Sequence, residues 1–493
     1  LAKRTSTAMG GGASKAKKQA SPAKAPAPAA PKETKEVAES PAVAPDVTST
    51  PAASEVVPEA SAAAANAGTS SKIEELTAQA KVAAEANPDN LCAKTLLEAE
   101  VQTWMATLPA AKLDELALCA KSGLDNHDSG LGCYAVDPAN YDELAPFFDR
   151  VCEGYHHGGG KVHTTNWSLD GVEGLPEDGQ LDLQKLGLGK ELSMRVRVGR
   201  NLTAFPLPGL MTKADRVNFE KTMLKAFDVL KANPDYGGNV FSMTPNDVWS
   251  EVTGEAENPN LISADKYQEL VDAHVMFKDM AADPYLASAG IASDWPCGRG
   301  CYQSADGGFI IWFGEEDQLR IMCMAKGFVL NTVFDRLHTA LQAVEAIDGI
   351  AFATSTKYGY VTSCPSNLGT GMRASVHVAV PNLTSDGTDA KAKAAAKPLG
   401  LSVRGMGGEH TPIGKDGTID LSPSSRLFIT EAEIVTKLYN GIKLLLEKEA
   451  EAMPQGEPAP EASAAAANAG TSSKIEELTA QAKVAAEANP DNL

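Results

Sequence analysis

Apolar residues recur at helical spacing through residues 92–155, where strand-like alternation is scarce. The apolar stripe consists of Leu96, Leu97, Val101, Trp104, Leu113, Leu116 and Leu118. Side chains three and four positions apart share one face of a helix. The pattern therefore predicts a small all-helical domain.

From about residue 160 the pattern changes to strands with long helices among them. Alternation predicts two strands, one with Met194, Val196 and Val198 on a single face and one with Ala374, Val376 and Val378, while residues 309–313 form a buried strand. A last helix begins at a capping box, Thr430 with Glu433, and its apolar stripe is Ile434, Leu438, Ile442 and Leu445. These elements predict a larger α+β domain.

The first 60 residues contain Ala, Pro, Ser, Thr and Lys but no aromatic residue. Such a segment cannot bury enough apolar surface to offset the entropy of ordering, which predicts a disordered tail. Its first 35 residues hold eight basic side chains against Glu33 alone. The tail is thus a solvated linker or an electrostatic tether to an acidic partner or membrane surface.

An identical segment occurs twice in the sequence, because residues 58–91 recur unchanged as residues 460–493. In each copy an Ala-rich linker leads into a helix, which in the first copy is predicted to start at the Ser71/Glu74 capping box. The spacing is far too long for a solenoid and favours duplicated domains. The alternative is a duplicated linker without a second domain.

The predicted organisation has four parts. Residues 1–70 form a tail and linker, 71–159 a helical domain, 160–452 the α+β domain, and 453–493 a linker and the start of a second, truncated unit.

Charge and cysteine content narrow the classes of function. The 44 basic and 64 acidic residues give a net charge of −20, which disfavours general nucleic-acid binding. Eight cysteines without a CxxC pair favour a reducing compartment over a disulfide scaffold or structural zinc. No apolar run is long enough for a transmembrane helix. The chain begins with Leu1, so a targeting peptide ahead of it stays open.

The sequence contains no P-loop and no Rossmann fingerprint. The candidate residues for binding a nucleotide are arginines. Arg195 and Arg197 share a strand face, as do Arg373 and His377. Further arginines flanked by glycine or strand residues are Arg299, Arg320 and Arg404. Guanidinium groups bind phosphate oxygens bidentately, so the set predicts a polyphosphate cradle, with solvated strand faces as the alternative.

Acidic residues and one cysteine complete the candidate chemistry. Glu315, Glu316 and Asp317 follow the strand at 309–313, and Glu409 lies in a Gly-rich stretch. Surface solvation is the alternative for these acids. No protein metal site is predicted, because Mg²⁺ in phosphoryl-transfer sites is held largely by nucleotide and water. Cys364, in CPSNLGT, is predicted to have a depressed pKa beside the arginines, with an inert buried thiol as the alternative.

The segments CPSNLGT, WPCGRG, EEDQLRIM, MRVRVGRN and RASVHV, in their spacing, resemble the phosphagen (guanidino) kinases, and within them most closely the arginine kinases. The resemblance extends from about residue 72 to 450. It implies a small helical N-terminal domain and a larger domain with an antiparallel sheet flanked by helices, of the glutamine synthetase-like type. It also implies reversible transfer of the γ-phosphoryl group of MgATP to a guanidino nitrogen.

The resemblance assigns roles by position. The nucleotide phosphates would be bound by Arg195, Arg197, Arg320, Arg373 and Arg404, with His377 on the nucleotide side. The guanidino group would be held by Glu316, Glu409 and Cys364, with Ser366 beside it. The loop that receives the amino-acid end of the substrate would contain Ser129, Gly130, Leu131 and Tyr134. Gln303 and Gly407 depart from the arginine-kinase pattern.

The sequence thus predicts a MgATP-dependent arginine kinase that buffers ATP in the cytoplasm. Open alternatives are another guanidino substrate such as taurocyamine or a creatine-like compound, a protein-arginine kinase, and a tethered structural protein with a kinase fold. An anchoring partner for the basic tail and flagellar or organellar targeting also stay open. The Gly-rich segment 404–417 is predicted to close over the substrates.

Overall fold

The computed structural model describes residues 59–407 and 411–453. The predicted basic tail, the second copy of the repeat and Glu409 lie outside these ranges. Within them, no helix combines the length and the apolar character that crossing a membrane requires.

The N-terminal part is all-helical. Its helices are α1 (Glu59–Ala86), α2 (Leu91–Leu96), α3 (Ala99–Met105), α4 (Ala110–Asp125), α5 (Asn140–Glu143) and α6 (Ala145–His156). Their core contains the predicted Leu96, Val101, Leu113 and Leu116. Leu118 was predicted wrongly, since its side chain is 40% exposed.

Helix α1 begins at Glu59, so the predicted start at the Ser71/Glu74 capping box is wrong. Both residues lie inside the helix. The residues ahead of them are rich in alanine, the strongest helix former, and this continues the helix toward the N-terminus.

The larger domain is built on one eight-stranded antiparallel sheet in the order β2-β3-β4-β5-β1-β8-β10-β9. The strands are β1 (Leu192–Arg200), β2 (Asn239–Ser242), β3 (Gly300–Gln303), β4 (Phe309–Phe313), β5 (Leu319–Gly327), β8 (Met372–Ala379), β9 (Leu401–Arg404) and β10 (Thr418–Pro423). Strands β6 (Thr354–Ser355) and β7 (Gly359–Tyr360) form a separate hairpin.

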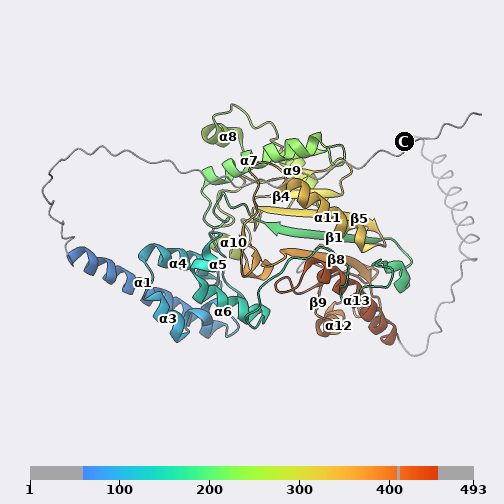
Figure 1. Ribbon diagram of the computed structural model, residues 1–493, viewed down its shortest axis with the longest axis horizontal. Helices are drawn as coiled ribbons and strands as arrows, with labels where there is room; N and C mark the ends of the chain where they lie inside the picture. The colour runs from blue at the N-terminus through green and yellow to red at the C-terminus, as the bar shows by residue number, and fades with distance from the viewer. Residues whose placement is uncertain (1–58, 408–410, 454–493) are drawn as a thin grey trace, which may run out of the picture. The chain divides into compact units, whose positions relative to one another are not determined.

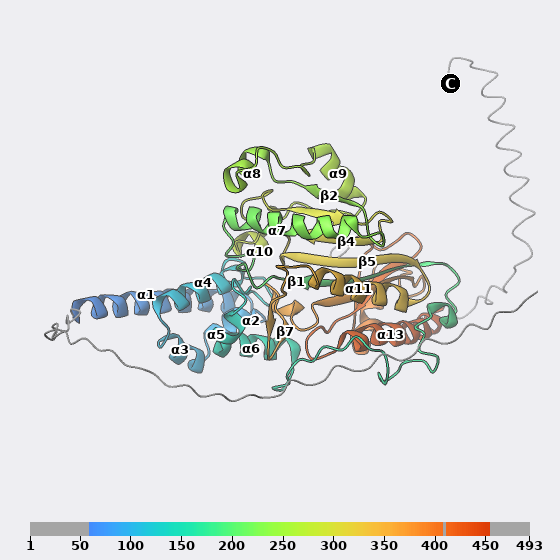
Figure 2. The same ribbon diagram turned by 45° about the horizontal axis from the view of Figure 1, so that its top comes forward.

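Alternation along the strands gives the sheet one apolar face, and the opposite face is polar around β1 and β8. At the β2–β5 end the opposite face is apolar too, since Ile310 and Met322 pack there in a second cluster with residues 270–280. Met194, Val196 and Val198 of β1 are buried on the apolar face, as predicted. Three helices cover this face: α7 (Lys213–Ala232), α11 (Leu330–Glu345) and α13 (Glu431–Glu451) (Figures 1 and 2). The predicted Thr430/Glu433 capping box opens α13.

The remaining helices are short and lie in the connections. They are α8 (Asn246–Thr253), α9 (Ala264–Asp272), α10 (Pro284–Ser288), α12 (Ala390–Ala396) and the 3₁₀ turns Leu183–Leu186, Pro365–Asn367 and Lys397–Leu399.

Hydrogen bonds to the backbone carbonyls of residues 362–363 join the helical domain to the sheet domain. The amide of Ala135 donates to the carbonyl of Ser363 at 2.7 Å, and the Tyr141 hydroxyl donates to the carbonyl of Thr362 at 2.8 Å. The helical core also contains Tyr358, Val361 and Leu368 from the sheet domain. The segment around Cys364 is therefore held from both sides.

Candidate active site

The polar face of the sheet brings four of the predicted arginines together. Arg197 on β1 lies opposite Arg373 on β8, and Arg195 is two residues away on the same face. Arg320 on β5 lies opposite Gly199, the next β1 residue on that face. The strand register thus gathers cations that are far apart in sequence.

Asp420 fixes two of these arginines. Its carboxylate on β10 is 1% exposed and lies 3.1 Å from Arg373 and 3.6 Å from Arg195. Arg404 on β9 is paired in register with the same aspartate. Asp420 is therefore a buried counter-charge shared by Arg195 and Arg373.

Arg197 does not take part in the ion pairs with Asp420. It forms no ion pair or side-chain hydrogen bond within the described ranges, and burial and the neighbouring Arg320, Arg195 and Arg373 hold its pKa well below the usual value. An arginine remains protonated in proteins, so the lowered pKa reports an electrostatic cost. A bound polyanion would relieve that cost.

Glu316 lies at the β5 end of the arginine group. Its carboxylate is 3.6 Å from Arg320, which also pairs with Glu315 at 2.8 Å, and Asn367 donates to it at 3.2 Å. Burial raises the pKa of Glu316 to about 7, against the opposing effect of Arg320. A carboxylate with this pKa can exchange a proton near neutral pH.

Asp317, the last residue of the acidic cluster, has a structural position. It accepts hydrogen bonds from the Ser363 amide at 2.7 Å and from the Asn201 side chain at 2.8 Å. Its other oxygen sits so close to Gly199 that a Cβ there would approach it to 2.7 Å. Asp317 therefore anchors the segment before Cys364 over Gly199 of β1, close enough to Arg320 for the two charges to affect each other's pKa.

Cys364 lies beside Glu316, but the predicted depressed pKa is wrong for the free protein. Burial, followed by the charge of Glu316, raises the pKa of the thiol to about 12, and the hydrogen-bonding contact with Ser366 at 3.1 Å lowers it less. The arginines do not set this pKa, because the nearer charge is an anion and the thiol has little water around it. Cys364 is a neutral thiol when no substrate cation is present.

The rate of alkylation checks this protonation state. Cys364 is 9% exposed and is the most accessible of the eight cysteines. We expect iodoacetamide to label it slowly at pH 8 and faster in Glu316→Gln, where the neighbouring anion is gone. Peptide mass spectrometry would quantify the labelling, and rapid labelling at pH 7 that is indifferent to this substitution would contradict the neutral thiol.

The predicted substrate loop reaches the site through Tyr134. Burial, then the charges of Cys364 and Glu316, raises the pKa of Tyr134, which places its phenol near both groups. The other three residues of the loop are held from behind: the carbonyl oxygens of Ser129, Gly130 and Leu131 accept hydrogen bonds from the Asn87 side chain and from the amides of Leu91 and Cys92. No hydrogen bond joins them to Glu316 or Cys364 in the described part of the chain.

A cavity of about 770 Å³ opens at the other end of the arginine face, and His377, Ser193, Lys326 and Met406 line part of it. His377 on β8 lies opposite Asp420. Burial and the nearby arginines lower the pKa of His377 although Asp420 raises it. The cavity has the volume typical of a small-molecule site.

Arg299, which the sequence grouped with the other arginines, is elsewhere. Its guanidinium is fully buried and donates to the carbonyl oxygens of Cys297, Ile291 and Gly314 at 2.6, 2.8 and 3.1 Å. It holds loops together and has no part in the cationic face.

Sequence reasoning missed three residues of the site. Asp420 could have been noticed as a lone acid inside the apolar strand TIDLS. Asn367, within CPSNLGT, supports Glu316. Arg426 lies near enough to Arg404, Cys364 and Glu316 for their charges to affect its pKa, which burial lowers. Nothing in its flanking sequence, SPSSRLF, distinguishes it.

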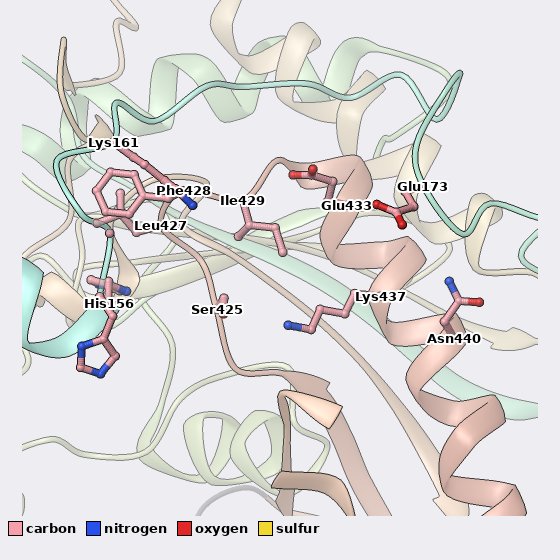
Figure 3. Close-up of a pocket in the computed structure, with 12 residues that line it drawn as sticks. His156, Lys161, Glu173, Ser425, Leu427, Phe428, Ile429, Glu433, Lys437 and Asn440 are labelled. Atoms are coloured by element: carbon pink, nitrogen blue, oxygen red, sulfur yellow. The ribbon is translucent and has the colours of Figure 1, made fainter. Parts of the chain in front are cut away.

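A separate cavity of about 490 Å³ lies between the end of α6 and the start of α13 (Figure 3). Figure 3 shows Lys161 and Lys437 reaching into it, with Glu173 and Glu433 at one side. His156 lines this cavity and also contacts the segment next to Cys364, since its Nε2 is 2.9 Å from the Pro365 carbonyl oxygen. The cavity contains none of the predicted site residues.

Among the residues described, no group of three or more His, Cys, Asp or Glu side chains is arranged to hold a metal ion.

Comparison with known proteins shows which proteins the chain resembles. The model of the ATP:guanido phosphotransferase C-terminal catalytic domain matches residues 244–452, and that of the N-terminal domain matches residues 87–153. An arginine kinase of Anthopleura japonica is 36% identical over 340 residues, which are 68% of this chain and 43% of that protein. The testis creatine kinase of Oncorhynchus mykiss is 34% identical over 339 residues, 67% of this chain and 80% of the relative.

A solved structure shares the fold. The substrate-free duplicated taurocyamine kinase from Schistosoma mansoni superposes with a TM-score of 0.61 at 29% identity, over 78% of this chain and 50% of that one. The chain thus spans half or less of two of these longer proteins. The predicted fold, a helical domain followed by an antiparallel sheet domain, is confirmed.

Proposed function

The chain belongs to the ATP:guanido phosphotransferase (phosphagen kinase) family, and from that membership we propose that it transfers the γ-phosphoryl group of MgATP reversibly to the guanidino group of L-arginine. The products are ADP and phosphoarginine. Such a reaction stores phosphoryl groups and buffers ATP.

The observation that supports this function best is the pairing of an arginine face with a raised-pKa carboxylate. We assign the nucleotide phosphates to Arg195, Arg197, Arg320, Arg373 and Arg404. Charge on the transferring phosphoryl group is stabilised by fixed cations, and catalysis of this reaction class depends mainly on positioning and electrostatics. Asp420 would keep Arg195 and Arg373 in place while the site is empty.

We assign the nucleoside end of ATP to the cavity beside His377 and Ser193. Mg²⁺ enters with the nucleotide as MgATP and supplies charge neutralisation on its phosphates. The position of the cavity at the end of the arginine face supports this assignment, because the phosphates would then point along β1 toward Arg320 and Glu316.

We assign the guanidino group to Glu316, Cys364 and Glu409, with Ser366 holding the thiol of Cys364. The attacking nitrogen must lose a proton as the P–N bond forms and the P–O bond to ADP breaks. Glu316 as a carboxylate would align the guanidinium and accept that proton. Glu409 is assigned from the family resemblance alone, since it lies outside the described residues.

Substrate choice within the family is the finer part of the proposal. Tyr134 and the loop of Ser129, Gly130 and Leu131 are assigned to the amino-acid end of the substrate, and the short DSGLGCY loop favours arginine over creatine. Taurocyamine is the second candidate, because a taurocyamine kinase shares the fold and is itself duplicated.

A panel of substrates tests this choice. With MgATP in a coupled assay for ADP, we expect kcat/KM for L-arginine to exceed that for taurocyamine and creatine by at least tenfold, a difference of about 1.4 kcal/mol in transition-state binding. D-arginine is the matched control for recognition of the α-amino acid head. A higher kcat/KM with taurocyamine would move the proposal to the second candidate.

The cytoplasm is the proposed location. All eight cysteines are free, which is usual in a reducing compartment. An anchoring role for the basic tail is a separate proposal, and deleting residues 1–58 would test it by changing localisation without changing turnover.

A further inference from the structure

The proposed substrate loop, residues 129–134, lies between two contacts of the helical domain with the sheet domain. After the loop, the Ala135 amide donates to the Ser363 carbonyl at 2.7 Å. Before the loop, α4 packs on α10 of the sheet domain (Figures 1 and 2). Glu316 and Cys364 belong to the sheet domain, so these two contacts determine where the loop lies relative to them.

Helix α10 is hydrogen-bonded to the residues just before the loop. The Tyr285 hydroxyl donates to the Asp128 carboxylate at 2.7 Å, and this bond raises the pKa of Tyr285. The Asn126 side chain donates to the Ser288 hydroxyl at 3.0 Å. The Ser122 hydroxyl donates to the Tyr285 carbonyl, also at 3.0 Å. Asp128 directly precedes the loop, so α10 fixes the loop at its first residue.

Arg299 connects α10 to the turn that carries Glu316. Its buried guanidinium donates to the carbonyl of Ile291, just after α10, at 2.8 Å and to the carbonyl of Gly314 at 3.1 Å. The Gly314 amide donates to the Gln318 carbonyl at 2.9 Å and closes the turn around Glu316. Helix α10 and the Glu316 turn therefore belong to one hydrogen-bonded unit.

We propose that α10 is a positioning element for the guanidino substrate, because it fixes the separation between the substrate loop and Glu316. The inference rests on the proposed function, in which Glu316 binds the guanidino end and the loop receives the amino-acid end. A substrate held at both ends binds tightly only where this separation matches its length. A loop that is already in place loses little conformational entropy when the substrate binds.

The contacts within the helical domain cannot replace α10. Asn87, Leu91 and Cys92 bind the loop carbonyls from behind, and these residues maintain the shape of the loop. They belong to the same domain as the loop, so they do not fix its place relative to Glu316. Without α10, the loop keeps only the contact at Ala135 as its nearby attachment to the sheet domain.

Tyr285→Phe combined with Ser288→Ala tests the positioning role. The substitutions remove two hydroxyl groups and leave the tyrosine ring and the helix, and Asp128 is exposed, so the fold should be kept. We expect KM for L-arginine to rise about tenfold, since two hydrogen bonds that hold the loop are lost. The turnover number and KM for MgATP should stay within about twofold of wild type, because the Glu316 turn and the arginine face are untouched.

Tyr267→Phe is the matched control. The Tyr267 hydroxyl on α9 donates to the Phe277 carbonyl at 3.2 Å, within the sheet domain and away from the loop. This variant also loses one tyrosine hydrogen bond, and its kinetic constants should equal those of wild type. An increase in KM for L-arginine alone, in the α10 variant and not in the control, supports the inference. An unchanged KM for L-arginine, or an equal increase in both KM values, would overturn it.

Hydrogen exchange without substrate provides a readout that does not depend on phosphotransfer. The Ser129 amide donates to the Asn126 carbonyl at 3.1 Å, in the turn that α10 holds. This amide should exchange at least tenfold faster in the α10 variant and at the wild-type rate in Tyr267→Phe. If wild type transfers a phosphoryl group to none of the guanidino compounds, the proposed function fails. Faster exchange would then still support the hold of α10 on the loop, and unchanged exchange would overturn it.

Discussion

Arg197→Met is expected to lower kcat by about a thousandfold and to raise the melting temperature by several degrees. The loss follows because a fixed cation facing the phosphates stabilises the transition state, a contribution of roughly 10²–10³ per group in comparable sites. The gain follows because Arg197 is a half-buried cation that lies beside three other arginines and has no ion-pair partner among the described residues. Methionine keeps much of the volume of the arginine side chain and removes the charge repulsion with the neighbouring arginines.

Arg299→Met is the matched control for Arg197→Met. Its guanidinium donates to three buried carbonyl oxygens, and replacement leaves these acceptors without partners, so the melting temperature should fall. Calorimetry and steady-state kinetics on the two variants separate the roles. Near-normal turnover of Arg197→Met would remove it from the phosphate site, and a lower melting temperature would contradict the electrostatic cost.

Glu316→Gln is expected to lower kcat by two to four orders of magnitude, the range for loss of a positioned general base. In the free protein the pKa of Glu316 is about 7, so kcat/KM for the guanidino substrate should rise with pH through neutrality in the wild type. The glutamine variant should lose that rise. A rate profile unchanged by the substitution would exclude Glu316 as the base.

The same substitution has a stability consequence with a defined sign. Folding raises the pKa of Glu316 from 4.5 to about 7, so the folded state binds this proton more tightly than the unfolded chain does. The ionised Glu316 carboxylate therefore destabilises the folded state. This loss of stability is absent below pH 4.5, grows as the pH rises and is complete above pH 7. Glu316→Gln should therefore melt higher than wild type at pH 8.5, with a smaller difference at pH 5.5.

Periodicity predicted the local elements of the fold. The alternation at Met194, Val196 and Val198 identified the buried face of β1, and the stripe beginning at Ile434 identified the buried face of α13. These predictions hold because which side chains share a face of a strand or helix depends only on their spacing within that element. The start of α1 was mispredicted because alanine propensity extends a helix without any apolar stripe.

Sequence pattern could place Arg195 and Arg197 on one face, but their grouping with Arg373 and Arg320 depends on strand order and register. In the sheet β1 lies between β5 and β8, which follow it by more than a hundred residues. The flanking residues had grouped these arginines as a polyphosphate cradle but wrongly included Arg299, and the family resemblance gave the set without it. Neither source indicated Arg426, whose neighbours are set by tertiary packing.

The protonation of Cys364 could not be predicted from its neighbours in sequence. The motif suggested a thiol among arginines, whereas the structure puts the Glu316 carboxylate closer and excludes most water. Burial and a nearby anion both oppose the thiolate, and together they outweigh the more distant cations. A bound guanidinium would reverse the sign of the local charge.

Phosphorus NMR of the reaction mixture tests the central claim most directly. Purified full-length protein incubated with MgATP and L-arginine should convert the γ-phosphate signal of ATP into a new phosphoramidate signal that disappears in acid, and added MgADP should drive the conversion back. Glu316→Gln, prepared in parallel, should show neither change over the same time. Failure to form a P–N product with L-arginine, taurocyamine or creatine, from protein whose circular dichroism shows it to be folded, would contradict guanidino phosphotransfer at this site.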